Sequence, residues 1–272
     1  MIRLAITGAA GKMGLAIARC VKRNTDFSIV AAIEATEHKA LGQDIGSLAG
    51  TGIIGVPLVS DLSMMANADV IIDFTFHTAV PANVGSAVNF KKPIVIGTTG
   101  LNNEEKNCLI QAAKLIPIVC SPNMSLAVNL LFSLVQYAAS ILGIEYKIDI
   151  DETHHIHKKD APSGTALQLA EKAARGRRQV AEDTILFDRD GTTIRRNNNM
   201  DKIIIHSHRR GEVVGDHTVT FDNDAETLEL THHAWNREAF ALGALHAARW
   251  VINKPPGIYD MQDVLSLQIH NL

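Results

Sequence analysis

The feature that most limits the possible folds is a regular alternation of two kinds of segment along the first 125 residues. Five short runs rich in apolar and β-branched residues predict strands: IRLAIT, FSIVAAIE, DVIIDFT, KPIVIGTTG and IPIVCSP. Most of them are separated by helix-favouring segments such as GKMGLAIARCVKR and NNEEKNCLIQAAKLI. Strands that alternate with helices form parallel sheets with helices on both faces. The first part of the chain is therefore predicted to be an α/β domain with a parallel sheet.

The second part of the chain predicts a different arrangement. The segment NMSLAVNLLFSLVQYAASILG is typical of one long helix, and another helix is expected at about residues 163–175. Strands are predicted at YKIDIDE and then in succession at TILFDRD, KIIIHSHR, VVGDHTVTFD and ETLELTHHA. Because consecutive strands favour antiparallel pairing, an α+β domain is expected over residues 127–238. The tail, with the helix REAFALGALHAARWVI, is assigned to the first domain, which then comprises residues 1–126 and 239–272.

The composition is that of an ordinary globular protein. With 272 residues, of which 46% are apolar and 20% charged, the chain can bury enough surface for two domains. Three cysteines do not form a complete disulfide framework, so a reducing cytoplasm is expected. We expect no secretion signal at the N-terminus, and no apolar stretch of about 18 residues that could span a membrane. The net charge of −3 argues against nucleic acid as a partner.

The first candidate site is the glycine motif GAAGKMG, Gly8 to Gly14, at the end of the first predicted strand. Glycines at positions 8, 11 and 14 permit a tight turn and the close approach of a phosphate, which the unpaired amides of the next helix can bind. A plain glycine turn between strand and helix is the alternative. Glu34 ends the second strand 20 residues after Gly14, where a carboxylate can accept hydrogen bonds from a ribose. The pair favours a dinucleotide site.

Other predicted strands end in polar segments at the same edge. DFT, residues 73–75, and GTTG, residues 97–100, follow the third and fourth strands. Since ligands of open parallel sheets bind outside the carboxyl ends of the strands, both would line the nicotinamide half of the groove. An ordinary strand-to-helix turn is the alternative for GTTG. The next segment, SPNMS at residues 121–125, is either a cofactor contact or a hinge that starts a helix.

The segment ETHHIHKKDAPSGTA, residues 152–166, concentrates charged groups and raises three possibilities. His154, His155 and His157 could hold zinc, but the two lysines that follow them oppose a bound cation. A solvated basic loop is the second possibility, although it leaves DAPSGTA unexplained. Third, Ser163 is a candidate helix N-cap, and a helix start next to a basic loop suits a small anion with several carboxylates.

The same segment resembles the E-x-HHxxK-x-DAPSGTA signature of the dihydrodipicolinate reductase family, the 4-hydroxy-tetrahydrodipicolinate reductases of diaminopimelate and lysine biosynthesis. GAAGKMG, DFT, GTTG, NMSLAVN and GEVVGDH also occur in the family's order, so the resemblance covers nearly the whole chain. It implies a Rossmann-like domain completed by the tail, and an inserted α+β domain with a mixed or antiparallel sheet. It also implies NADH or NADPH as the cofactor, a small dicarboxylate substrate, a homotetramer and no metal.

The resemblance also implies roles for individual residues. His154 matches the catalytic histidine and Lys158 the proton donor, while His155, Gly164 and Thr165 match residues that hold the substrate. Arg237 matches a basic position near the hinge. The positions that match cofactor contacts are Gly8, Ala9, Ala10, Gly11, Lys12, Met13, Glu34, Gly97, Thr98, Thr99, Ser121, Pro122, Asn123 and Met124.

Two residues depart from the family pattern. Ala35 stands where many relatives have an arginine, which bears on the choice between NADH and NADPH, and Met124 stands where an aromatic residue is common. Two other classes of function remain open on the residues alone. One is another nicotinamide-dependent dehydrogenase of amino-acid metabolism, and the other is a nucleotide sensor without catalytic activity.

Overall fold

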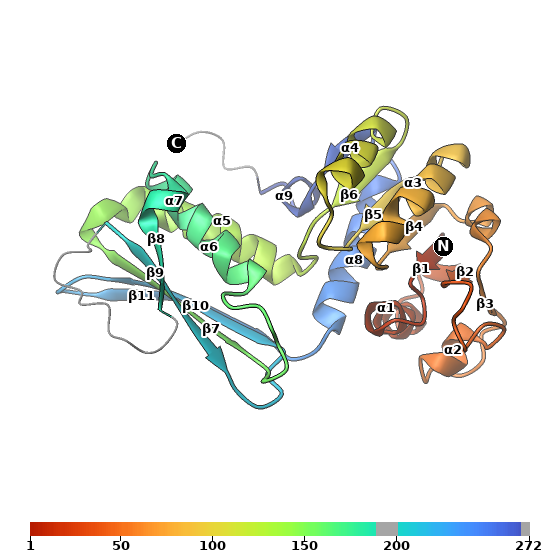
Figure 1. The fold of residues 1–272 in the computed structure, drawn as a ribbon, viewed down its shortest axis with the longest axis horizontal. Helices are drawn as coiled ribbons and strands as arrows, with labels where there is room; N and C mark the ends of the chain where they lie inside the picture. The colour runs from red at the N-terminus through yellow and green to blue at the C-terminus, as the bar shows by residue number, and fades with distance from the viewer. Residues whose placement is uncertain (189–200, 268–272) are drawn as a thin grey trace. The chain divides into compact units, whose positions relative to one another are not determined.

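The computed structural model describes residues 1–188 and 201–267. The chain folds into two compact units, one formed by residues 1–126 and 237–266 and the other by residues 127–236 (Figure 1). The second unit is thus an insertion between two parts of the first.

The first unit contains a seven-stranded sheet in which every pair of neighbours is parallel. The five predicted strands are present, and two short strands are added at the edges of the sheet. Its strand order is β12-β6-β5-β4-β1-β2-β3. The strands are β1 (Ile2–Thr7), β2 (Phe27–Ile33), β3 (Leu58–Val59), β4 (Val70–Asp73), β5 (Ile94–Ile96), β6 (Pro117–Cys120) and β12 (Gly257–Tyr259).

Helices cover both faces of this sheet, as the alternating sequence pattern predicts (Figure 1). Helices α1 and α8 pack on one face around Leu4 and Ile6, and α3 and α4 pack on the other around Ile71 and Ile94. Because both faces are covered, the strands consist mainly of apolar residues. The helices are α1 (Lys12–Lys22), α2 (Ile45–Leu48), α3 (Val80–Asn89), α4 (Asn103–Ala112), α8 (Glu238–Val251) and α9 (Met261–Val264), with short 3-10 turns at Leu62–Asn67 and His77–Ala79.

The second unit contains a five-stranded mixed sheet with the order β11-β10-β7-β9-β8. Strand β10 is antiparallel to both β7 and β11, whereas β9 is parallel to both β7 and β8. The expectation of antiparallel pairing between consecutive strands is therefore wrong for β8 and β9. Helix α6 (Gly164–Gly176) between β7 and β8 returns the chain so that β8 runs in the same direction as β7, and β9 lies between these two strands and is parallel to both. The strands are β7 (Lys147–His154), β8 (Ile185–Asp188), β9 (Ile203–Arg209), β10 (Gly215–Asp222) and β11 (Thr227–Ala234).

Two long helices cover one face of the mixed sheet. They are α5 (Leu126–Leu142) and α6 (Gly164–Gly176), and both match the sequence prediction. Phe132 of α5 and Leu169 of α6 are buried against Ile150 and Val219 of the sheet. A 3-10 turn at Gly143–Glu145 and the short helix α7 (Ala181–Thr184) complete the described helices of this unit.

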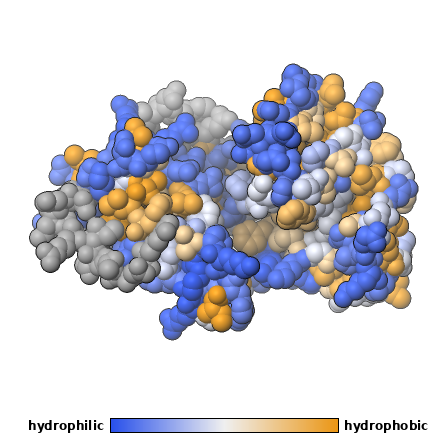
Figure 2. Space-filling view, in the orientation of Figure 1, coloured by the Kyte–Doolittle hydropathy of each residue, from blue (hydrophilic) through white to orange (hydrophobic). Residues whose placement is uncertain are grey.

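Helix α5 is apolar on both of its faces. With the turn that follows, it forms a stretch of 20 residues, Leu126–Glu145, that is long and apolar enough to cross a membrane by length and composition. The expectation that no such stretch exists is therefore wrong. Its inner face, with Val128, Leu131, Phe132, Val135 and Ala139, is part of the core of the second unit. On its outer face Leu130, Leu134, Tyr137 and Ile141 are partly exposed, and Figure 2 shows apolar side chains on the visible surface of both units.

Candidate active site

The glycine motif forms a turn between β1 and α1 that only glycine can make. Gly8 has a φ of 71°, and a Cβ atom there would lie 2.2 Å from the carbonyl oxygen of Phe74. A Cβ atom on Gly14 would lie 2.4 Å from the carbonyl oxygen of Gly8. Gly11 precedes α1 without a side-chain cap, and Lys12 at the start of the helix is exposed. This leaves a helix start to which a phosphate can approach closely.

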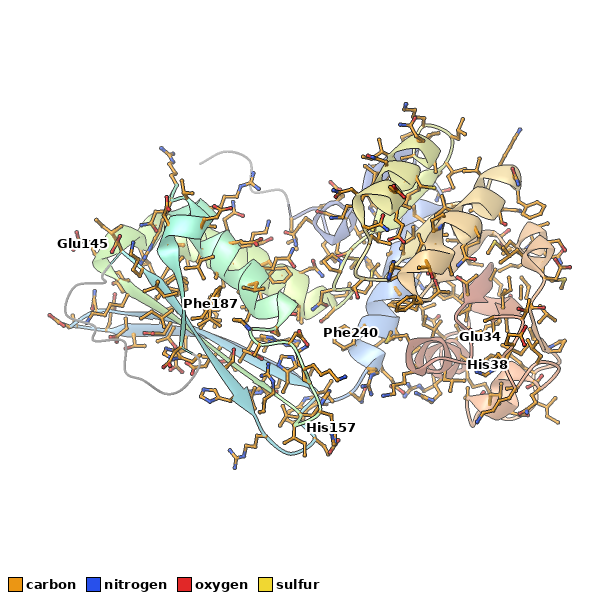
Figure 3. All side chains as sticks on the ribbon, in the orientation of Figure 1. Glu34, His38, Glu145, His157, Phe187 and Phe240 are labelled. Carbon is orange, nitrogen blue, oxygen red and sulfur yellow. The ribbon has the colours of Figure 1, made fainter. Side chains whose placement is uncertain are left out.

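Glu34 lies beside this turn, as its spacing in the sequence predicts. Its Oε2 atom accepts a hydrogen bond of 3.1 Å from the amide of Ala10, and its Oε1 atom accepts one of 3.1 Å from the amide of Ala35. His38 follows in the same loop, where its Nδ1 atom accepts a hydrogen bond of 3.2 Å from the amide of Ala40. Glu34 and His38 both come from the part of the chain that follows β2 (Figure 3). The carboxylate is thus held at the carboxyl end of β2 next to the glycine turn.

Asp73 joins the DFT and GTTG segments and does not itself face solvent. Its carboxylate is fully buried at the end of β4. It accepts hydrogen bonds of 2.8 Å from Thr75 Oγ1, 2.6 Å from Thr98 Oγ1 and 2.6 Å from Asn83 Nδ2. The Thr98 side chain is therefore engaged in the interior, whereas Thr99 is exposed. Asp73 fixes the shape of the polar edge that two neighbouring strands form.

The SPNMS segment has the structure of a helix entry. Ser121 is buried and its Oγ atom donates a 3.0 Å hydrogen bond to the carbonyl oxygen of Asn123. The Met124 side chain is buried among the core residues of the first unit, which leaves only its backbone for a cofactor contact. Pro122 is exposed. Position 243 on α8 packs against this segment and must be glycine, because a Cβ atom there would lie 1.7 Å from the carbonyl oxygen of Met124.

The signature segment begins on β7 and ends in the first turn of α6. His154 is the last residue of β7 and is almost buried, whereas Lys158 lies in the loop with its Nζ atom 2.8 Å from Asp160 Oδ2. Ser163 is the N-cap of α6, as predicted, and its Oγ atom accepts a 3.1 Å hydrogen bond from the amide of Ala166. The structure thus brings the end of a strand, a basic loop and a helix start into one part of the second unit.

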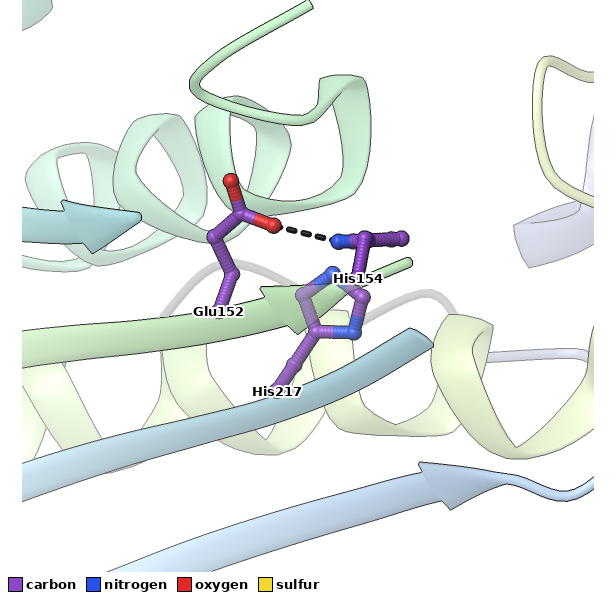
Figure 4. Close-up of side chains that lie close together, drawn as sticks. All are labelled: Glu152, His154 and His217. Carbon is purple, nitrogen blue, oxygen red and sulfur yellow. Dashed lines mark hydrogen bonds and ion pairs between the residues drawn. The ribbon is translucent and has the colours of Figure 1, made fainter. Parts of the chain in front are cut away.

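Glu152 is the buried centre of this site. Its carboxylate is completely excluded from solvent and accepts a hydrogen bond from His154 Nδ1 (Figure 4). Its other oxygen accepts hydrogen bonds from the amide of Ser163 at 3.2 Å and from Arg209 at 3.1 Å. Burial raises the pKa of Glu152, but the hydrogen bonds from His154, Ser207 and Arg209 outweigh burial and lower it to about 2. The carboxylate is therefore ionised at neutral pH.

His217 on β10 completes the buried cluster. Its ring centroid lies 5.1 Å from that of His154 in an edge-on arrangement (Figure 4). Its Nε2 atom is 3.2 Å from Ser163 Oγ. Burial, followed by the nearby His154, lowers the pKa of His217 to about 3, so this ring is neutral at physiological pH.

The three histidines of the sequence-based zinc alternative do not form a cluster among the described residues. A different set, Glu152, His154 and His217, places its potential ligand atoms within 4.8 Å of one another. Arg209 is bound to Glu152 at 3.1 Å, and His154 Nδ1 donates to the same carboxylate. These contacts already balance the carboxylate charge that would bind a metal ion, which disfavours a divalent metal at this position.

Removal of metal ions is expected to leave the activity unchanged, because Arg209 already pairs with the carboxylate of the cluster and His154 is hydrogen-bonded to it. The check is to measure turnover with and without a strong chelator. Loss of turnover that zinc then restores would contradict this expectation and assign a metal to the cluster.

Glu152, Arg209 and His217 have no site role in the prediction from the sequence. The burial of Glu152 could have been predicted from the sequence of β7, because alternate residues of a strand share one face. Ile148 and Ile150 precede it on the buried face of β7, so a carboxylate at the next position must enter the core. Arg209 and His217 come from β9 and β10, and only the strand order brings them to β7.

Comparison with known proteins agrees with this geometry. The family models for the N-terminus and the C-terminus of dihydrodipicolinate reductase match residues 2–124 and 127–265. The 4-hydroxy-tetrahydrodipicolinate reductase of Anaeromyxobacter dehalogenans strain 2CP-1 is 44% identical over 98% of this chain and 99% of its own. That of Syntrophus aciditrophicus is 40% identical over 98% of this chain and 100% of its own.

Among solved structures, dipicolinate-bound dihydrodipicolinate reductase from Paenisporosarcina sp. TG-14 superposes with a TM-score of 0.72. It is 25% identical in sequence, over 97% of this chain and 98% of its own. The similarity covers both units and confirms the family that the sequence motifs predict. The chain belongs to the dihydrodipicolinate reductase family of NAD(P)H-dependent oxidoreductases.

Proposed function

We propose that this chain reduces 4-hydroxy-tetrahydrodipicolinate, via dihydrodipicolinate, to tetrahydrodipicolinate in diaminopimelate and lysine biosynthesis. The observation that carries the proposal is the ETHHIHKKDAPSGTA segment, in which an almost buried histidine, a lysine and a capped helix start come together in the second unit. The related structure was solved with dipicolinate, a small ring with two carboxylates. A site of this kind suits such a ligand, because helix starts and cations both stabilise carboxylates.

The reaction requires a hydride and a proton. The nicotinamide supplies the hydride when NADH or NADPH is bound. Conjugate addition of the hydride leaves an enamine-like carbon that must be protonated, and Lys158 is the donor in this account. His154 binds or polarises the substrate next to it, while His155, Gly164 and Thr165 hold the carboxylates. A positioned proton donor of this type contributes about 10²-fold to 10⁴-fold to the rate.

The first unit is the nucleotide domain in this proposal, and the second is the substrate and assembly domain. The glycine turn of residues 8–13 binds the pyrophosphate, and Glu34 accepts hydrogen bonds from the adenosine ribose. Residues 97–99 and 121–124 take the nicotinamide half, with Met124 contributing its backbone only. The observation in support is that Glu34, the glycine turn and the Asp73-anchored loops lie at the carboxyl ends of parallel strands.

NADH is expected to be used at least as well as NADPH, because the Glu34 carboxylate repels a 2′-phosphate and Ala35 provides no cation to offset it. Changing Ala35 to arginine should shift kcat/KM toward NADPH by about 1 kcal/mol or more, the scale of one hydrogen bond to a charged group. The measurement is kcat/KM for both cofactors at low salt. Ala35→Gln is the matched control, because it adds length without charge. A preference of about tenfold or more for NADPH in the unchanged protein, equivalent to about 1.4 kcal/mol, would contradict this assignment.

We also propose that the protein is a cytoplasmic homotetramer. The family assignment and the apolar side chains that α5 exposes in the described part of the chain favour the tetramer, and the free cysteines favour the cytoplasm. Light scattering coupled to gel filtration tests the assembly and should give four times the 29.5 kDa chain mass. A mass of one or two chains would contradict the tetramer.

A substrate comparison tests the reaction itself. The oxidation of NADH and NADPH is followed with the product of dihydrodipicolinate synthase, with amino-acid semialdehydes, and without substrate. Turnover on the first substrate is expected to exceed the others greatly. Faster turnover on a semialdehyde would favour another dehydrogenase, and no turnover despite nucleotide binding would favour a sensor.

A further inference from the structure

Glu152 occupies a position where an ionised carboxylate is costly. It is completely buried on the face of β7 that packs against the helices, in line with Ile148 and Ile150. An isolated buried charge destabilises a fold by several kcal/mol unless it is paired and hydrogen-bonded. Here donors from three places in the unit offset this cost: His154 on β7, the amide of Ser163 before α6, and Ser207 and Arg209 on β9.

The carboxylate determines which nitrogen of His154 carries a proton. An ionised carboxylate can only accept hydrogen bonds, so the Nδ1 atom of His154 must be the donor. The other nitrogen, Nε2, is then the one available to a ligand. It lies next to Gly215, where an added Cβ atom would be 3.0 Å away, so the glycine leaves space beside Nε2. A fixed tautomer of this kind sets what a histidine can donate or accept.

The same carboxylate is connected to Lys158 through two further contacts. Arg209 donates a hydrogen bond from Nη1 to Glu152 and another from Nη2 to the backbone carbonyl oxygen of Asp160. The side chain of Asp160 in turn lies 2.8 Å from Lys158 Nζ. A continuous chain of polar contacts therefore runs from His154 through Glu152, Arg209 and Asp160 to Lys158.

We propose that Glu152 and Arg209 are positioning residues. Glu152 fixes the tautomer of His154, and Arg209 fixes the position of the loop that carries Lys158. This inference rests on the proposed function for its kinetic consequences, but the tautomer itself is independent of the reaction. A carboxylate that only stabilised the fold would affect the free energy of unfolding without affecting the proton on His154.

The direct test is nitrogen NMR of ¹⁵N-histidine-labelled protein, with His154 assigned by comparison with His154→Gln. In the unchanged protein the neutral ring of His154 should carry its proton on Nδ1. In Glu152→Gln the Nδ1–H signal should be lost or reduced, because the amide group can present its NH₂ to the ring. A neutral His154 with its proton on Nε2 in the unchanged protein would overturn the proposal, whatever the variant does.

Kinetics provide the second readout. Glu152→Gln should lower kcat by about 10-fold to 100-fold, the usual effect of losing the partner that orients a functional histidine. The Kd for NADH should stay unchanged. An unchanged kcat in a folded Glu152→Gln protein would overturn the proposal.

Asp151→Asn is the matched control. Asp151 is the preceding residue of β7, and it also pairs with a histidine, His208, at 3.3 Å. It lies on the opposite face of the strand and is exposed, so its loss should leave kcat and the Nδ1–H signal of His154 unchanged. If the unchanged protein fails to reduce the dicarboxylate, the proposed function fails, while the NMR result still decides the role of Glu152.

Discussion

Replacing Lys158 by alanine is expected to lower kcat by about 100-fold or more, while the Kd for NADH stays within about twofold of its original value. The physical reason is that the reaction leaves a carbon that must gain a proton, and an ammonium at the substrate is the donor. Lys158 is suited to this role because its Nζ atom is held 2.8 Å from Asp160, and its side chain is only 22% exposed. Steady-state rates and a nucleotide titration measure the two quantities separately.

Lys159→Ala is the control for the loss of a positive charge. Lys159 is adjacent in the same loop but exposed, so its removal should change kcat little. The decisive distinction is between kcat and KM. A Lys158→Ala enzyme with unchanged kcat and only a raised KM would show that this lysine binds a carboxylate and does not donate the proton. His154→Ala is expected to lower kcat to a similar extent.

Replacing Gly8 by alanine is expected to weaken NADH binding by about tenfold or more and to destabilise the protein by about 2–4 kcal/mol. Two costs combine at this position. A φ of 71° is strained for a residue with a Cβ atom, and that atom would lie 2.2 Å from the carbonyl oxygen of Phe74. The backbone must therefore move at the place where the phosphate approaches. Nucleotide titration and denaturant unfolding measure the two effects.

Gly50→Ala is the control that separates the strain of a positive φ from the clash of the added Cβ atom. Gly50 also has a positive φ, of 73°, but an added Cβ atom would have no neighbour within 4 Å. Its replacement should cost about 1–2 kcal/mol of stability from backbone strain alone and leave NADH binding unchanged. If Gly8→Ala bound NADH as well as Gly50→Ala does, the glycine turn would not be the phosphate site.

Much of the fold could be predicted because its long elements carry strong local signals. The strands buried on both faces are continuous apolar runs, and α6 begins at a serine that caps it. Strands β3 and β12 have only two and three residues, too few for a period to show. The parallel pairing of β9 with β7 and β8 joins strands that are distant in sequence, so no local pattern indicates it.

Site residues that lie within one segment could be predicted from the sequence. Site residues that come from several strands could not. His154, Lys158 and Ser163 lie within one short segment, so their types and spacing could be interpreted together. Arg209 reaches Glu152 only through the pairing of β7 with β9. Asp73 similarly resembles a site residue at a strand end, whereas its carboxylate is buried and anchors Thr98. Burial of this kind is a property of the packed sheet.

The central claim is that this chain transfers a hydride from the nicotinamide to the ring of a cyclic dicarboxylate. The most direct test uses NADH carrying deuterium at the transferred position, the product of dihydrodipicolinate synthase as substrate, and mass spectrometry of the product. Our account predicts tetrahydrodipicolinate with one deuterium bound to a ring carbon, formed in step with NADH consumption, and a far lower yield with Lys158→Ala. Product without deuterium, or no consumption of NADH or NADPH with this substrate, would contradict it.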